Sequence, residues 1–431
     1  MNHQEVELLA VGAGPSNLAL AVAVDEMAPK NFSQSTLLIE RHHDIAWQRG
    51  MLLPWTQSQV SFLKDLVTLR NPRSEFSFVN YLHSVGRLDA FVNLGSFTPY
   101  RAEISGYLRW VARSLRSVRV ETGRTCVGIE PISRRVGEVD SWLVRLADGS
   151  TIGTPNLVIG TGRDPHVPGP FCDLPSDRVI HSTDYSERTV DLDPSQYYRI
   201  AVIGGAQSAA EMLWETHQRL PLADCTMVMR SIGLNAYESS KFTNELYFPS
   251  FTDEFFDANP AVRQQLLAEM RRTNYSGLSP AMLDTLYRQV YLERLTGKER
   301  LRMITMAEVR SADMDGDDVV LSLADRKTRQ TGELRCDLVM LGTGFVPSMP
   351  RLVRELADQI GIPTIEVRRC YQLTTPPSVT ARCYLQGVNE DSHGIADSLL
   401  SVLGTRAGEI VADVLAHRTA PTRLPALVNG R

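Results

Sequence analysis

The chain has 431 residues, of which 43% are hydrophobic and 22% charged, and its formal net charge is -5. These values are typical of a soluble globular protein with room for two or three domains, and the slight acidity argues against a nucleic-acid partner. The longest purely apolar run, 18–24, is too short to cross a bilayer, and the six cysteines form no C-x-x-C pair. We therefore expect a cytoplasmic protein with no membrane partner, no disulfide framework and no metal site.

The first predicted unit spans residues 6–40. A strand-like apolar run ends at Gly12, a glycine turn follows, and an Ala/Leu-rich helix continues to about Met27. Such a turn lets a pyrophosphate approach free amides at the helix N-terminus. The next strand ends at Glu40, whose carboxylate would bind ribose hydroxyls and repel a 2′-phosphate. The unit predicts a site for FAD or NAD, although Asn17 replaces the third glycine of the motif; an ordinary strand-to-helix turn is the alternative.

Two adjacent charges, Lys64 and Asp65, have apolar residues on both sides. The apolar neighbours favour turning at least one of them toward the interior, where its charge must be paired, whereas a surface ion pair on a helix is the commoner arrangement of adjacent charges and stays open. Strand-like runs follow over 118–121, 142–146 and 157–159, the last entering the Gly-Thr-Gly sequence 160–162. This order predicts a β-meander that returns to the first sheet. Three prolines within 165–170 indicate the exit from the first domain.

A second strand, glycine turn and helix begin at Arg199 and include the turn 204–209. The next strand ends on Arg230, at the place that Glu40 occupies in the first unit. A guanidinium there suits a 2′-phosphate, so this second site should prefer NADPH. Ala206 departs from the usual glycine and would weaken NADPH binding by about 1 kcal/mol if its backbone angle were strained.

The stretch 235–294 is polar, rich in aromatic residues and mostly helical in pattern. Its Asn244 and Asn274 could bind a zwitterionic ligand through donors and acceptors, or simply cap loops. Asp315-Gly316 predicts a hairpin turn, and 336–345 repeats the strand and Gly-Thr-Gly pattern of 157–162. The C-terminal part, 384–406, is expected to form a strand, a loop and a closing helix whose N-terminus could face a flavin ring or be capped by Asp397 or Ser398.

These motifs together resemble the flavin-dependent N-hydroxylating monooxygenases, especially the L-ornithine N5-hydroxylases of hydroxamate siderophore biosynthesis. The resemblance runs through 11–18, Ser-Phe-Leu-Lys-Asp-Leu at 61–66, Gly-Ala-Gln-Ser-Ala-Ala-Glu at 205–211, 337–345 and 393–401. It implies an α/β fold with two Rossmann-like dinucleotide-binding domains and a helical substrate-binding insertion. We expect the FAD domain at 1–190 and 341–431, the NADPH domain at 191–235 and 295–340, and the insertion at 236–294.

The resemblance also implies a set of site residues. For FAD these are Gly12, Gly14, Pro15, Ser16, Asn17, Glu40, Arg41, Trp47, Gln48, Gln59, Val127, Ser398, Leu399 and Leu400. For NADPH they are Gly205, Ala206, Gln207, Ser208 and Arg230, with Asn244, Asn274 and Tyr275 among the further cofactor contacts. For the substrate they are Lys64, which would meet the amino acid's carboxylate, Asn244, Asn274 and Ser401. Arg101, Asn274 and Ser401 are expected to serve catalysis, Arg101 in NADPH handling and flavin reduction. Ser58, where a longer residue is common, is expected to loosen the flavin pocket.

The implied reaction is FAD- and NADPH-dependent hydroxylation of the side-chain amine of L-ornithine by O2, through a C4a-hydroperoxyflavin. The same chemistry on L-lysine or a diamine is one alternative, and an NADPH-dependent flavin reductase or a non-catalytic flavin-binding protein is another. A disulfide reductase would need a redox-active cysteine pair, which the sequence lacks. The resemblance further implies a homo-oligomer, a tetramer in that family.

Overall fold

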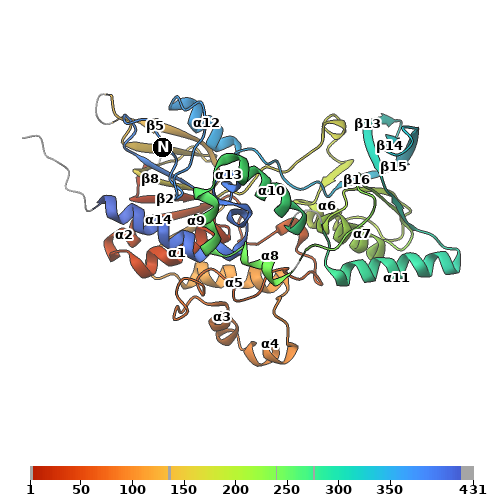
Figure 1. Ribbon diagram of the computed structural model, residues 1–431, viewed down its shortest axis with the longest axis horizontal. Coiled ribbons are helices and arrows are strands. Elements are labelled where there is room, and N and C mark those ends of the chain that lie inside the picture. The colour runs from red at the N-terminus through yellow and green to blue at the C-terminus, as the bar shows by residue number, and fades with distance from the viewer. Residues whose placement is uncertain (1–2, 134–136, 239, 275–276, 419–431) are drawn as a thin grey trace, which may run out of the picture.

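The computed structural model describes residues 3–133, 137–238, 240–274 and 277–418. Its first sheet has five parallel strands in the order β17-β8-β2-β3-β4. The strands are β2 (Leu8–Val11), β3 (Thr36–Glu40), β4 (Arg119–Thr122), β8 (Asn156–Ile159) and β17 (Arg382–Leu385). Two helices from opposite ends of the chain, α1 (Pro15–Met27) and α14 (Leu403–Arg418), pack against each other beside this sheet (Figure 1). The predicted strand, turn, helix and strand of 6–40 are confirmed.

A β-meander interrupts the first sheet, as predicted. Its strands are β5 (Cys126–Ile132), β6 (Ser141–Leu146) and β7 (Thr151–Thr154), which pair antiparallel, and β1 (His3–Glu5) adds to β7 in parallel. The chain then returns to the sheet as β8. The remaining elements of this part are α2 (Lys30–Gln34), η1 (Arg49–Met51), α3 (Phe78–Ser84), α4 (Leu88–Leu94), α5 (Arg101–Ser114) and α12 (Arg351–Gln359).

The second sheet is also parallel, in the order β12-β11-β10-β16-β9. Its strands are β9 (Val179–His181), β10 (Arg199–Ile203), β11 (Asp224–Val228), β12 (Leu301–Ile304) and β16 (Leu338–Leu341). Around it lie η2 (Gly169–Phe171), α6 (Tyr185–Thr189), α7 (Gln207–Arg219) and an antiparallel sheet of β13 (Ala307–Asp315), β14 (Asp318–Asp325) and β15 (Thr331–Cys336). The predicted hairpin turn is confirmed, with Gly316 at a φ of 63° between β13 and β14.

Each sheet brings its glycine turn against a Gly-Thr-Gly sequence. A Cβ on Gly12, whose φ is 92°, would lie 2.8 Å from the Gly160 carbonyl oxygen, and one on Gly204, whose φ is 137°, would lie 2.5 Å from that of Gly342. Only glycine tolerates both the backbone angle and the close approach. The two nucleotide-type halves therefore repeat one architecture, as the paired strands 157–159 and 338–341 predicted.

The domain limits differ from those predicted in two places. Strand β9 pairs with β16 in the second sheet, so the first domain ends before 179 and not at 190. A three-residue strand carries too little pattern to be recognised. The predicted insertion 236–294 is also divided: α11 (Pro280–Thr296) packs on the second sheet, whereas the helices that precede it pack on the segment 395–402.

The helices between the two sheets are α8 (Lys241–Glu245), α9 (Pro249–Asp257), α10 (Pro260–Asn274) and α13 (Glu390–His393) (Figure 1). They share a small core, including Tyr247, Phe255 and Met270, with Ile395 and Val402. The closing helix begins later than expected, because two 3-10 turns, η3 (Ile395–Ser398) and η4 (Leu400–Val402), precede α14. Ser398, Leu399 and Leu400 therefore lie before the last helix and not at its start, and Asp397 and Ser398 do not cap it.

Candidate active site

The first glycine turn has the geometry of a dinucleotide cradle. Helix α1 begins at Pro15, and its N-cap, Gly14, supplies no side-chain hydrogen bond to the first amides. A Cβ on Gly14 would meet nothing within 4 Å, so the backbone faces open space there. The Glu40 carboxylate accepts from the amides of Ala13, at 2.9 Å, and His42, at 3.0 Å, which fixes it beside the turn. Free amides and a fixed carboxylate fit the pyrophosphate and ribose of FAD.

Asn17 has a structural task that the sequence did not indicate. It is fully buried, and its Nδ2 donates to the carbonyls of Val11 and Gly12, while its Oδ1 accepts from Gln386 Nε2 at 2.8 Å. A Cβ on Gly160 would lie 2.7 Å from this amide. Asn17 therefore fills the space below the turn and attaches the turn to the segment after β17.

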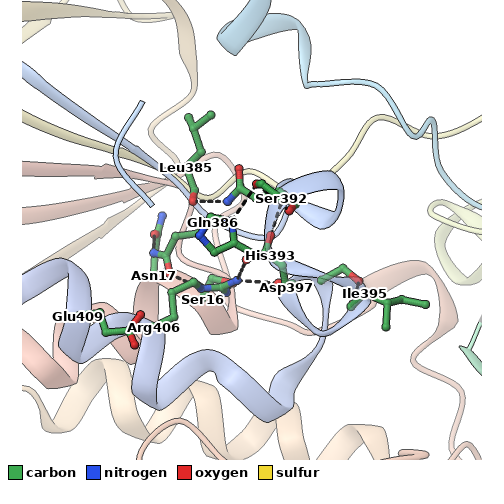
Figure 2. Close-up of polar contacts among 12 residues, drawn as sticks. Ser16, Asn17, Leu385, Gln386, Ser392, His393, Ile395, Asp397, Arg406 and Glu409 are labelled. Atoms are coloured by element: carbon green, nitrogen blue, oxygen red, sulfur yellow. Dashed lines mark hydrogen bonds and ion pairs between the residues drawn. The ribbon is translucent and has the colours of Figure 1, made fainter. Parts of the chain in front are cut away.

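Gln386 belongs to a buried polar network centred on Arg406 (Figure 2). The fully buried guanidinium donates to Gln386 Oε1 at 3.0 Å, to Asp397 Oδ1 and carbonyl oxygen at 2.6 Å each, and to Ser16 Oγ at 2.8 Å. Asp397 also accepts from the Asn389 amide at 2.7 Å. The network joins the first glycine turn to η3, whose last residue, Ser398, is the first of the predicted flavin and substrate residues 398–401.

The second glycine turn has a similar open helix N-terminus. The N-cap of α7 is Ala206, which gives no side-chain cap. Its φ of -115° is ordinary extended backbone, so the conformational strain that the sequence suggested there is absent. Arg230 is exposed and lies two residues beyond the end of β11, whereas Glu40 is the last residue of β3, so the strand ends earlier than the predicted Arg230. These features fit a nucleotide with a 2′-phosphate, although the Gln207 side chain is already bonded to Glu211 and to the Ser279 amide.

A cavity next to the first turn brings together three of the segments that carry the family resemblance, 11–18, 61–66 and 393–401. Its walls include Pro15 of the turn, Lys64 and Leu400. The remaining lining comes from 58–66, Phe78 and the segment 99–108. Ser58, at this wall, is buried and bonds locally to Val60. The cavity is narrow, with a volume of about 20 Å³, and it lies between the FAD-type turn and residues predicted to bind the substrate.

Lys64 and Asp65 turn inward, but they do not pair. Asp65 accepts from the amides of Val67, Thr68 and Phe78 and from the Thr68 hydroxyl. Burial raises the pKa of Asp65 against these hydrogen bonds. Lys64 Nζ lies 4.7 Å from the centroid of the Phe248 ring, and burial lowers its pKa. The inward turn is confirmed, whereas the surface helical ion pair is wrong: the segment forms turns, and among the described residues no ion pair joins the two.

The substrate residues named in the sequence lie on segments that pack near one another. Phe248, which touches Lys64, follows Asn244 of α8 by one turn. Ser401 is buried and adjoins Val402, which shares a core with Tyr247 and Met270. Asn274 ends α10, one turn after Met270, and its side chain lies outside the described residues, as does Tyr275. Among the described residues no carboxylate pairs with the half-buried Lys64, so its ammonium group could bind an anionic group of a small ligand.

Arg101 occupies the junction of the two sheets. Its guanidinium makes two 2.7 Å bonds to the Glu211 carboxylate of α7 and one of 3.1 Å to the Met51 carbonyl. Both side chains are buried. A residue predicted for NADPH handling thus lies between the two nucleotide turns, and its catalytic role stays a prediction.

The comparisons with known proteins agree with this geometry. Residues 4–347 match the family described as L-lysine 6-monooxygenase/L-ornithine 5-monooxygenase. The chain belongs to this family. An L-ornithine N(5)-oxygenase of Arthrobotrys oligospora is 37% identical, over 95% of this chain and 88% of its own length. The ornithine hydroxylase PvdA from Pseudomonas aeruginosa superimposes with a TM-score of 0.90 at 35% identity, covering 96% of this chain and all of its own, 100%. The ornithine N-hydroxylase KtzI of Kutzneria sp. 744 superimposes with a TM-score of 0.90 at 34% sequence identity, covering 96% of this chain and 100% of its own. Its structure is named for reduced FAD, NADP+ and L-ornithine.

The other predicted FAD residues of this family member do not line the cavity. Trp47 is half-buried, and its amide donates to Ser105 Oγ at 3.1 Å. The exposed ones are Arg41, Gln48, Gln59 and Val127. Their contact with the cofactor stays a prediction. Ser398 is exposed and Leu399 is half-buried, whereas the half-buried Leu400 lines the cavity.

Within the described ranges, no group of three or more histidine, cysteine, aspartate or glutamate residues is arranged to hold a metal ion. Nor does any helix in those ranges combine the length and apolar composition needed to span a membrane. All six cysteines are free thiols.

His393 gives the monooxygenase a testable pH dependence. Its ring stacks on Tyr371 with centroids 4.2 Å apart, and burial lowers its pKa to about 4. The unfolded chain, with a histidine pKa near 6.5, binds the proton first, so stability should fall as pH decreases from about 6.5 to about 4 by up to about 3 kcal/mol. His181 and His217, whose pKa values burial also lowers, add to this slope. Thermal unfolding across this range should show a shallower slope for His393→Gln, and an unchanged slope would contradict the assignment. The exposed His83→Gln is the control.

Proposed function

We propose that the protein is an L-ornithine N5-monooxygenase that uses FAD, NADPH and O2 and forms N5-hydroxyornithine for a hydroxamate siderophore or a related product. The single observation that carries this proposal is Lys64, a half-buried cation at the wall of the cavity beside the first glycine turn. Family membership, and relatives named for ornithine, support it.

In this proposal the first glycine turn and Glu40 hold FAD, and the second turn with Arg230 holds NADPH. The flavin, when bound, supplies the redox chemistry with O2. Lys64 binds the substrate carboxylate through a charge-assisted bond, so the side-chain amine extends away from it. Asn244, Asn274 and Ser401 orient the rest of the amino acid. The amine must lose a proton before it can attack an oxygen atom, and enclosure by the helices between the two sheets favours its neutral form.

The choice of ornithine over lysine depends on one methylene, which a pocket discriminates by about 1–3 kcal/mol. A panel of ornithine, lysine, putrescine and no amine tests it, with NADPH consumption and hydroxylamine formation measured together. We expect the highest kcat/KM for hydroxylamine with ornithine. A higher value for lysine would overturn the substrate assignment alone, and flavin reduction without any hydroxylamine would favour a flavin reductase and overturn the function.

The proposal includes a homo-oligomer, as the family resemblance implies. Tyr287, Tyr291 and Leu295 are spaced by four residues on α11 and are 71%, 58% and 69% exposed. Such an apolar stripe is costly on a free surface, so we place a contact between copies there. Light scattering coupled to gel filtration should give more than one chain per particle, and Tyr291→Lys should lower that number. A monomeric wild-type protein would contradict the proposal.

The reduced cysteines suit a cytoplasmic location.

A further inference from the structure

Glu211 makes the buried ion pair that crosses between the two sheets. It is 1% exposed, and its two carboxylate oxygens accept hydrogen bonds of 2.7 Å from Nη1 and Nη2 of Arg101. Arg101 is the first residue of α5, and its amide donates to the Thr56 carbonyl. Glu211 belongs to α7, behind the second glycine turn. A two-bond pair of this kind fixes direction as well as distance.

The two helices that it joins belong to different nucleotide sites. On α5, Arg101 shares a face with Ile104 and Leu108, which line the cavity beside the first turn. On α7, Glu211 Oε1 also accepts from Gln207 Nε2 at 2.8 Å, one helical turn closer to the second glycine turn. One carboxylate thus connects the cavity wall to the start of the helix at the second nucleotide site.

We propose that Glu211 is a positioning residue for hydride transfer: it orients Arg101 and holds the second glycine turn, where NADPH is proposed to bind, at a fixed distance from the cavity beside the first turn. This inference rests on the proposed function. Transfer between two bound groups needs reacting atoms about 3–3.5 Å apart, and an error of about 1 Å can slow a reaction about 100-fold. A buried pair resists such a shift, and removing its negative charge leaves the Arg101 guanidinium buried without its partner.

Glu211→Gln tests the role with nearly unchanged shape. We expect flavin reduction by NADPH to slow by about tenfold or more, while the Kd of NADP+ changes by less than about threefold. Reoxidation by O2 after reduction with dithionite should equal that of wild type. Amide hydrogen exchange should increase in 49–56 and in the first turn of α5, and not in α14, which gives a readout independent of turnover.

Glu215→Gln is the matched control, one turn further along α7. Glu215 accepts from the neutral indole of Trp55 at 2.6 Å, and a glutamine can still accept that bond. Its flavin reduction should equal wild type. Glu211→Asp keeps the negative charge on a side chain that is one methylene shorter. Its flavin reduction by NADPH should slow selectively, as in Glu211→Gln, but to a smaller extent. If Glu211→Gln does not fold, the flavin reduction rate of Glu211→Asp tests the inference.

Three outcomes would overturn the inference. Flavin reduction at the wild-type rate in Glu211→Gln would do so, as would an equal loss in flavin reduction, dithionite-bypassed reoxidation and NADP+ affinity, which indicates a general structural defect. If wild-type protein itself is not reduced by NADPH, the proposed function fails with it. If NADPH reduces the flavin of the wild-type protein and reduces that of Glu211→Gln at the same rate, the proposed function stands and this role of Glu211 fails.

Discussion

Arg406→Met should release FAD and destabilise the protein by about 3–5 kcal/mol, because it leaves the buried Asp397 carboxylate without its cation. The substitution also removes the donors to Gln386 and to Ser16, which belongs to the first glycine turn (Figure 2). Loss of these bonds detaches η3 from the turn. Flavin fluorescence during heating reports release of the cofactor, and circular dichroism reports unfolding.

The matched control for this variant is Arg351→Met. Arg351 forms an exposed pair with Glu355 on α12, and such pairs contribute about 0–1 kcal/mol. Its FAD release temperature should equal that of wild type. If Arg406→Met retained FAD to the same temperature as Arg351→Met, the network would not support the flavin turn.

Lys64→Ala should raise the KM for ornithine by about 10- to 100-fold, the loss expected when a charge-assisted hydrogen bond of about 1.5–3 kcal/mol is removed. FAD binding and flavin reduction by NADPH without amine should persist, because the Lys64 ammonium group lies over the Phe248 ring and the first glycine turn is held by Glu40, Asn17 and Arg406. Steady-state hydroxylamine formation gives KM and kcat, and stopped-flow absorbance gives the reduction rate.

Putrescine sharpens this prediction, since it has the terminal amine of ornithine but no carboxylate. The variant should lose activity on ornithine and keep the wild-type value on putrescine, so the ratio between the two amines collapses. Lys241→Ala, an exposed lysine at the start of α8, should leave the ratio unchanged. An unaltered KM for ornithine in Lys64→Ala would remove Lys64 from the substrate site.

The parts of the fold that the sequence predicted are those encoded locally. A strand that stops at a glycine and opens a helix is a pattern of about ten residues, so both nucleotide-type units were recognised. The structure adds a second reason for Gly12 and Gly204, a positive φ combined with a close carbonyl oxygen. The inward turn of Lys64 and Asp65 followed from their apolar neighbours.

Contacts between distant segments could not be predicted in this way. Arg406 and Ser16 are 390 positions apart, and nothing in either neighbourhood indicates the other. The bond from Gln386 to the Asn17 side chain, which holds the turn to the segment after β17, was likewise not indicated, and contact of Asn17 with the cofactor stays a prediction. The ion pair of Glu211 with Arg101 was also not predicted. In the sequence Glu211 is only the last residue of a motif, and Arg101 lies 110 positions away in the other domain. Strand β9 has only three residues, too few to show the alternation of apolar and polar residues typical of a strand. The sequence therefore did not show that 179–181 belong to the second sheet.

Oxygen labelling of the product tests the proposed reaction most directly. The purified protein with FAD, NADPH, ornithine and isotopically labelled O2 should form N5-hydroxyornithine that carries one labelled oxygen on the side-chain nitrogen, with one NADPH consumed per product. NADPH consumption that yields only hydrogen peroxide, or a hydroxylated product whose oxygen comes from water, would contradict it.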